Sequence, residues 1–75
     1  MMGLNELSPG QRCMVVGLTH TGALRRRLLD LGFVAETAVE CLGRSPDGDP
    51  TAFLVRGAVI ALRSADAARI LVTRP

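Results

Sequence analysis

The side chains that could bind a metal ion or act as a nucleophile are few in this chain of 75 residues. The single histidine is His20, and the two cysteines are Cys13 and Cys41. None of them belongs to a Cys-x-x-Cys, His-x-x-x-His or Glu-x-x-His pattern, the spacings at which neighbouring side chains reach one ion. We therefore expect no metal site and no resident cofactor.

Each of these groups also has an ordinary structural explanation. Cys13 and Cys41 fall at positions that we expect to face the interior, where a thiol behaves as a small hydrophobic group. A redox or metal-carrying role for the pair would instead require reactive thiols. His20 precedes a helix, and we expect it in a solvent-exposed loop. Asp47 and Asp49 lie in a turn, where aspartate is common because its carboxylate bonds to nearby backbone.

Catalytic patterns are missing from the sequence. The serines Ser8, Ser45 and Ser64 have no histidine at a recognisable spacing and no glycine-rich turn of the kind that exposes a nucleophile. No phosphate-binding Walker pattern occurs. We expect a protein that is not an enzyme.

The clearest charge cluster is Arg25-Arg26-Arg27, in a chain whose net charge is only +2. One interpretation is a solvated helix face on which Arg26 pairs with Asp30 at the (i, i+4) spacing. The other is a contact with an acidic protein surface or with anionic lipid headgroups. Nucleic acid is not expected as a partner, because the chain has no Tyr or Trp on which bases could stack.

Length and composition limit the elements that can position these groups. The chain is long enough for one small domain, which we place at residues 1–75. Its core must be aliphatic, since only two residues are aromatic. No segment is long enough to span a bilayer, and the N-terminus lacks the pattern of a signal peptide, so we expect a cytoplasmic protein without direct membrane insertion.

The elements themselves follow from periodicity and turn residues. Strong helix formers between Thr21 and Gly32 predict a helix, with Thr21 as N-cap and Gly32 in a left-handed cap. Ser64 could cap a short helical turn over 65–69. Strands are expected at 11–18, 37–44, 51–55, 58–63 and 70–73. Five strands in so short a chain are most simply arranged as a closed or nearly closed barrel, with the helix covering one end.

The two-residue loop Arg56-Gly57 predicts a hairpin and fixes its register. Val55 should pair with Ala58, and each further pair lies one residue farther along both strands. Phe53, Val55, Ile60 and Leu62 then form the inner face. Leu54 and Val59 lie opposite each other on the outer face, flanked by Ala52 and Ala61. Such an apolar strip suggests contact with a partner, unless the helix or the segment Leu4 to Leu7 covers it.

With these elements in place, the chain resembles the FeoA family over nearly its whole length. The motifs that carry the resemblance are Leu7-Ser8-Pro9-Gly10, Leu24-Arg25-Arg26-Arg27-Leu28-Leu29-Asp30-Leu31-Gly32, Gly48-Asp49-Pro50, Arg56-Gly57, Ala61-Leu62-Arg63 and Ala67-Ala68-Arg69-Ile70. The chain departs from the family where it has Ala35-Glu36 in place of the usual Pro-Gly, and at Asp47, where an apolar residue is usual.

The resemblance implies a mainly β, SH3-like barrel of about five strands with one α-helix and a short helical turn. It also implies a non-catalytic accessory of ferrous iron uptake that contacts the FeoB membrane transporter from the cytosolic side. For the contact we choose Leu29, Leu54 and Val59 as apolar anchors, with Arg25 and Arg26 as a charged rim. A second copy of the chain is another possible partner.

Similar modules also occur in metal-dependent repressors. The alternative function is therefore that of a free-standing SH3-like regulator domain that binds a transition metal or nucleic acid.

Overall fold

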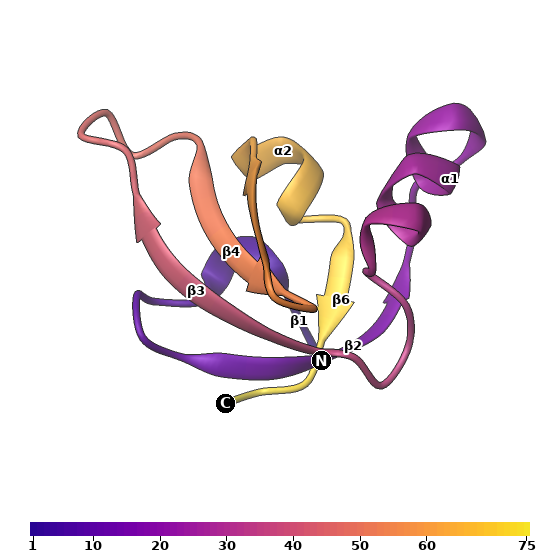
Figure 1. Cartoon of the computed structure of the whole chain (residues 1–75), viewed down its shortest axis with the longest axis horizontal. Helices are drawn as coiled ribbons and strands as arrows, with labels where there is room; N and C mark the ends of the chain where they lie inside the picture. The colour runs from indigo at the N-terminus through magenta and orange to yellow at the C-terminus, as the bar shows by residue number, and fades with distance from the viewer.

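Six strands form one antiparallel sheet in the spatial order β1-β6-β2-β3-β4-β5 in the computed structural model, which describes all 75 residues. The sheet curls into a half-open barrel (Figure 1). The strands are β1 (Met2–Gly3), β2 (Arg12–Leu18), β3 (Ala38–Arg44), β4 (Thr51–Val55), β5 (Ala58–Leu62) and β6 (Ile70–Val72). The helical elements are the 3-10 turn η1 (Leu4–Glu6), α1 (Gly22–Leu31) and α2 (Ser64–Ala67). The mainly β architecture is confirmed, with one more strand than expected.

The additional strand is β1, which pairs with β6 through Met2 and Val72. It brings the N-terminal segment into the molecule, so that Leu4 and Leu7 are completely buried. The alternative that Leu4 to Leu7 cover the outer face of the hairpin is therefore wrong. These side chains lie in the core because the pairing of β1 with β6 directs them inward.

Two β-bulges bend the sheet. One lies in β2 between Val15 and Gly17, and the other in β3 between Cys41 and Gly43. A bulge adds one residue to its strand and increases the local twist, which helps a short sheet to curl. The additional residues, Val16 and Leu42, are about two-fifths exposed.

The β4–β5 hairpin has the predicted register, from Val55 opposite Ala58 to Thr51 opposite Leu62. Its turn residues Arg56 and Gly57 both have positive φ, 49° and 77°, as a type I′ turn requires. On its inner face Phe53 and Val55 are fully buried, and Leu62 nearly so. The prediction from the two-residue loop is confirmed.

Helix α1 also occurs where it was predicted, but it packs loosely. Gly32 closes it with φ 113° and donates its N–H to the Leu28 and Leu29 carbonyls. Of its ten residues only Leu28 is buried. Figure 1 shows the helix at one side of the molecule. No helix of the chain is long and apolar enough to cross a bilayer.

Thr21 is the N-cap of α1, as predicted, but the predicted cap Ser64 of the second helix is wrong. The Thr21 side chain makes no cap hydrogen bond, because Gly22 has a φ of 66° that disrupts the usual geometry of a first helical turn. In α2 the N-cap is Arg63, and the Ser64 N–H donates to Asp49 Oδ1 at 2.9 Å. A carboxylate from the loop between β3 and β4 thus takes the place of the expected serine hydroxyl.

The turn after α1 contains Ala35-Glu36, where the chain departs from the family. Glu36 adopts a φ of 70°, a conformation in which glycine is more usual. Its N–H donates to the Val15 carbonyl at 2.8 Å, and the Thr37 N–H donates to Val34 at 3.2 Å. These hydrogen bonds hold the chain as it enters β3.

Candidate protein-interaction face

The outward side chains of the sheet form a row that runs across four strands. Arg12 of β2 lies opposite Glu40 of β3, Glu40 opposite Leu54 of β4, and Leu54 opposite Val59 of β5. The row is charged at one end and apolar at the other. Val59 is 66% exposed, the highest fraction for a large hydrophobic side chain apart from Met1, whereas Leu54 is half-buried.

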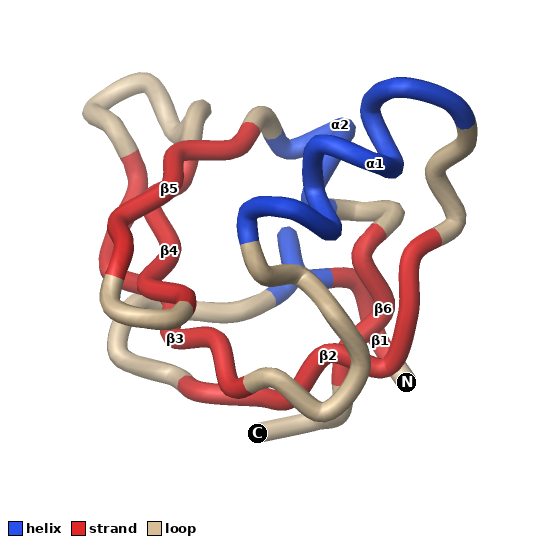
Figure 2. The backbone as a smooth tube through the Cα atoms, turned by 45° about the vertical axis from the view of Figure 1, so that its right-hand side comes forward, coloured by secondary structure: helices blue, strands red, loops and turns tan.

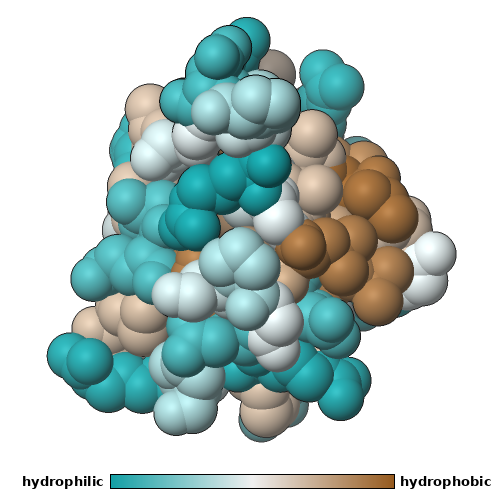
Figure 3. Space-filling view, turned by 90° about the vertical axis from the view of Figure 1, so that its left-hand side faces the viewer, coloured by the Kyte–Doolittle hydropathy of each residue, from teal (hydrophilic) through white to brown (hydrophobic).

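A third aliphatic side chain joins this apolar end. Leu42, the additional residue of the β3 bulge, lines a shallow hollow of about 410 Å³ together with Ala52 and Ala61. We call Leu42, Ala52, Leu54, Val59 and Ala61 the hairpin face. Figure 3 shows that hydrophobic surface on the β3 side of the molecule is gathered in a patch and not scattered.

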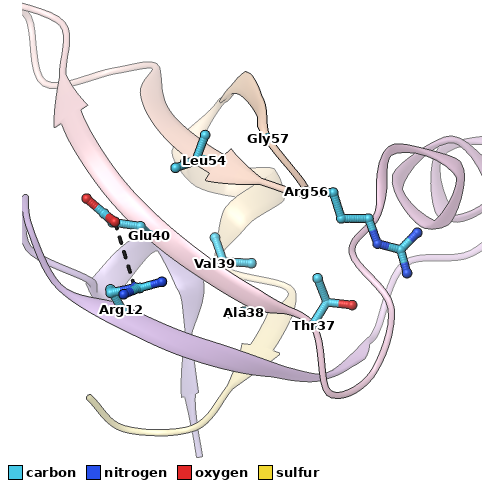
Figure 4. A pocket seen from close by; sticks show the side chains of 8 residues that line it. All are labelled: Arg12, Thr37, Ala38, Val39, Glu40, Leu54, Arg56 and Gly57. Atoms are coloured by element: carbon cyan, nitrogen blue, oxygen red, sulfur yellow. Dashed lines mark ion pairs between the residues drawn. The ribbon is translucent and has the colours of Figure 1, made fainter.

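A second hollow, of about 310 Å³, lies at the charged end of the row (Figure 4). Its lining includes Leu54, Thr37 and the turn residue Arg56. Arg12 Nε lies 3.8 Å from Glu40 Oε1, and the arginine side chain is 73% exposed. Such an exposed pair adds little stability. Its charges therefore remain available to a molecule that docks against Leu54.

The other predicted contact residues lie on α1, away from the hairpin face. Arg25 Nη1 donates to the Leu18 carbonyl at 2.9 Å, which ties the helix to the end of β2. Arg26 is exposed, and the expected pair with Asp30 is wrong, because the pair between Arg12 and Glu40 is the one ion pair of the chain. Leu29 is half-buried. Arg25, Arg26 and Leu29 line none of the three hollows of the structure.

The residues that sequence reasoning missed are Leu42, Arg12, Glu40 and Arg56. Gly43 after Leu42 was the one local sign of a bulge. The row from Arg12 to Val59 depends on how β2, β3 and β4 align, and no short loop in the sequence fixes that alignment.

His20 is buried, so its expected exposure is wrong. It is only 2% exposed, with Nε2 at 2.9 Å from the Asp66 carbonyl and no partner at Nδ1. A carbonyl can only accept, so Nε2 carries the proton. The preceding residue explains the burial, because Thr19 and Arg69 exchange four hydrogen bonds of 2.6 to 3.4 Å that draw this loop onto α2 and β6. Nowhere do three His, Cys, Asp or Glu side chains group as metal ligands would.

Both cysteines are free and buried, as predicted. Burial, with a smaller contribution from Cys41, raises the pKa of Cys13 from 9.0 to about 11. Burial also raises the pKa of Cys41, although the Arg44 guanidinium and a hydrogen bond from Gly43 oppose this. Thiols with raised pKa values react slowly, which argues against a redox role.

Comparison with known proteins gives consistent matches over almost the whole chain. The chain matches the FeoA domain family over residues 2–74. It is 32% identical over 71 residues to a fusion protein of Fe(2+) transport protein A and the Fe(2+) transporter FeoB from Porphyromonas gingivalis. This match covers 95% of the chain but only 8% of the fusion protein.

Two solved structures extend the similarity to the fold. The FeoA protein of Chlorobium tepidum is 37% identical, with a TM-score of 0.89 over 95% of this chain and 68% of that one. FeoA of Stenotrophomonas maltophilia, described as a prokaryotic SH3 domain protein complexed with zinc, is 32% identical, with a TM-score of 0.86 over 97% of this chain and 91% of that one. The curled sheet is thus an SH3-like barrel. From the family match and these relatives we conclude that the chain belongs to the FeoA family, whose members are linked to ferrous iron transport.

Proposed function

We propose that this chain is a cytoplasmic, non-catalytic accessory of ferrous iron uptake, formed by one domain, and that it binds a FeoB-type transporter at its cytosolic side. In the relative from Porphyromonas gingivalis, the parts named for the transport protein and for the transporter belong to one polypeptide. Joining two modules raises the effective concentration of each near the other, which is useful when the two act together.

The exposed Val59 of the hairpin face is the observation that carries the proposal. A hydrogen-bonded hairpin presents it beside Leu54, so that little conformational freedom is lost on binding. Contiguous exposed apolar surface with a charged rim is typical of a protein contact site. Arg12 and Glu40 supply that rim.

The interior supports a binding role over catalysis. His20 is enclosed and bonded to backbone, and the cysteines are buried thiols with raised pKa values. Both aromatic residues, Phe33 and Phe53, are fully buried, which leaves no aromatic surface for stacking RNA bases. This argues against the regulator alternative where nucleic acid is concerned.

The direct test is capture of the purified cytosolic part of the FeoB-type transporter from the same organism. Val59→Asp puts a charge into the hairpin face without touching the core, so it should weaken binding by roughly tenfold or more. Val16→Asp is the matched control, because Val16 is also an exposed valine but lies at the β2 bulge, outside the hairpin face. It should bind like the wild type.

Circular dichroism would first establish that both variants are folded. Equal loss in both variants, or no capture by the wild type at moderate salt, would contradict the proposal. Capture that falls steeply with rising salt and is replaced by RNA binding would favour the regulator domain.

A further inference from the structure

Strand β5 ends the sheet and has one free edge. It pairs only with β4, and none of the remaining backbone hydrogen bonds of the chain involves its residues. In a two-residue hairpin the residues next to the turn form a hydrogen-bonded pair. Ala58, Ile60 and Leu62 therefore direct their N–H and C=O groups toward β4. The corresponding groups of Val59 and Ala61 point away from it.

Nothing in the sequence of β5 protects this edge. Natural edge strands usually carry a charge, a proline or a bulge that prevents another strand from pairing with them. The strand reads Ala-Val-Ile-Ala-Leu from Ala58 to Leu62, and its register with β4 is unbroken. It is therefore ready to accept a further strand.

An apolar groove lies along this edge, between β5 and α1. Its volume is about 220 Å³, and Leu24, Leu28 and Leu31 line its helix side. On the strand side it is lined by inward residues, Ile60 and Leu62, and by the outward Ala61. Because both faces of β5 contribute, the groove follows the edge of the strand. Figure 2 shows α1 and β5 facing each other across the mouth of the barrel.

The charges around the groove select the kind of segment that would fit. Arg27 and Arg63 line it, and neither guanidinium has an ion-pair or hydrogen-bond partner. The single acidic side chain of the lining is Asp66. This excess of positive charge favours a negatively charged ligand. It disfavours a second copy of β5, because antiparallel pairing of two such strands would bring Arg56 and Arg63 of the two copies together.

We propose that the free edge of β5 and the groove beside it bind an extended, acidic and aliphatic peptide segment of a partner protein, which adds to the sheet as a further strand. Backbone hydrogen bonds to Val59 and Ala61 hold the segment. Alternate aliphatic side chains enter the groove against Leu24 and Leu31, and its carboxylates lie near Arg27. Apart from Ala61, this site does not use the side chains of the hairpin face, and its test needs no transporter.

The probe is a synthetic peptide with the sequence Glu-Val-Glu-Val-Glu-Val-Glu and blocked ends, titrated into the full chain and followed by amide NMR. Without peptide, the amides of Val59 and Ala61 should exchange quickly with solvent, whereas those of Ile60 and Leu62 should exchange slowly. Saturation with peptide should slow exchange at Val59 and Ala61 by roughly tenfold or more. The same peptide with N-methylated valines, or with Lys in place of Glu, should bind at least about tenfold more weakly.

Two protein variants separate the edge from general effects on folding. Ala61→Pro removes the outward N–H of residue 61, which makes no hydrogen bond to β4. The substitution should weaken peptide binding about tenfold. Retained slow exchange at Ile60 and Leu62 would show that the hairpin is intact. Ala61→Ser keeps the N–H and should bind within about twofold of the wild type. Arg27→Glu should weaken binding about tenfold and reduce its salt dependence.

Four results would overturn the proposal. They are no saturable binding at millimolar peptide, shifts confined to Leu42, Ala52 and Leu54 of the hairpin face, equal affinity for the Lys peptide, and protection of Val59 and Ala61 that grows with protein concentration alone. The last result would show that a second copy occupies the edge.

Discussion

The β4–β5 hairpin and helix α1 are both short local elements, yet they are held in place in opposite ways. The inner face of the hairpin is sealed by Phe53 and Val55, which are fully buried. Helix α1 buries Leu28 alone, and Leu24 and Leu31 remain more than a third exposed. A helix of ten residues is marginal by itself in water, so α1 depends on Leu28 and on the hydrogen bonds at its ends. The strands of the barrel therefore supply stability, whereas α1 offers apolar surface.

The strongest test of this difference is a pair of truncations. Phe53→Ala should reduce the free energy of unfolding by about 3 to 5 kcal/mol, because it leaves a cavity in the core. Leu24→Ala should reduce it by less than about 1 kcal/mol, because that side chain is already 39% exposed. Urea unfolding of both variants measures the difference. Similar losses of unfolding free energy in the two variants would mean that α1 contributes as much to stability as the strands of the barrel.

Thiol reactivity gives a second contrast. Since burial raises the pKa of Cys13 from 9.0 to about 11, its thiolate fraction near pH 8 should be about a hundredfold lower than in the unfolded chain. Labelling with a disulfide reagent should therefore be slow in the native protein. A Leu24→Cys variant should gain one rapidly labelled thiol on α1. Rapid labelling of the wild type would contradict the burial of Cys13 between the strands.

The same raised pKa makes stability depend on pH in a definite direction. Between pH 9 and about 11 the unfolded chain loses the Cys13 proton more readily than the folded chain does. The folded state therefore binds more protons, and the contribution of this thiol to stability is complete below pH 9 and falls as the pH rises toward 11. A Cys13→Ala variant should show a smaller decline over this range.

A fourth prediction concerns the end of α1. Gly32→Ala should destabilise the protein by about 1 to 2 kcal/mol, because the residue has a φ of 113°. An added Cβ would also come within 3.0 Å of Arg56 Cδ. Gly17→Ala is the control, since a Cβ there meets nothing within 4 Å. Thermal unfolding should rank the two variants in that order, and an equal effect would show that Gly32 is not under special constraint.

The smallest expected effect distinguishes two neighbouring arginines. Arg25→Ala removes the hydrogen bond to the Leu18 carbonyl and should lower stability by about 0.5 to 1 kcal/mol. Arg26→Ala removes no hydrogen bond or ion pair and should change stability by no more than about 0.3 kcal/mol. Chemical denaturation with both variants measured side by side is sufficient. A larger effect at Arg26 would indicate that Arg26 and Asp30 form an ion pair after all.

What could be predicted from the sequence depends on the range of the interactions involved. The hairpin register follows from two turn residues, and the end of α1 follows from Gly32, because both are fixed locally. The burial of His20 results from hydrogen bonds between Thr19 and Arg69, which are far apart in the chain. No local sequence pattern predicts such a long-range contact.

The candidate site divides in the same way. Leu54 and Val59 were found because the hairpin register is local. Leu42 was missed because its exposure arises from a bulge in β3, and Arg12 because its place in the row depends on the pairing of β2 with β3. Arg25 and Arg26 were chosen for their charge, and the structure places them on α1, apart from the hairpin face.

The pairing of β1 with β6 determines where a covalent tether would be attached. Met2 lies opposite Val72, so a linker joined to either end of the chain would leave the barrel from the same neighbourhood (Figure 1). In the sheet order, β5 lies at the opposite edge. A domain tethered at either terminus could therefore rotate about its attachment point, and the β4–β5 hairpin would remain accessible to a partner in both cases.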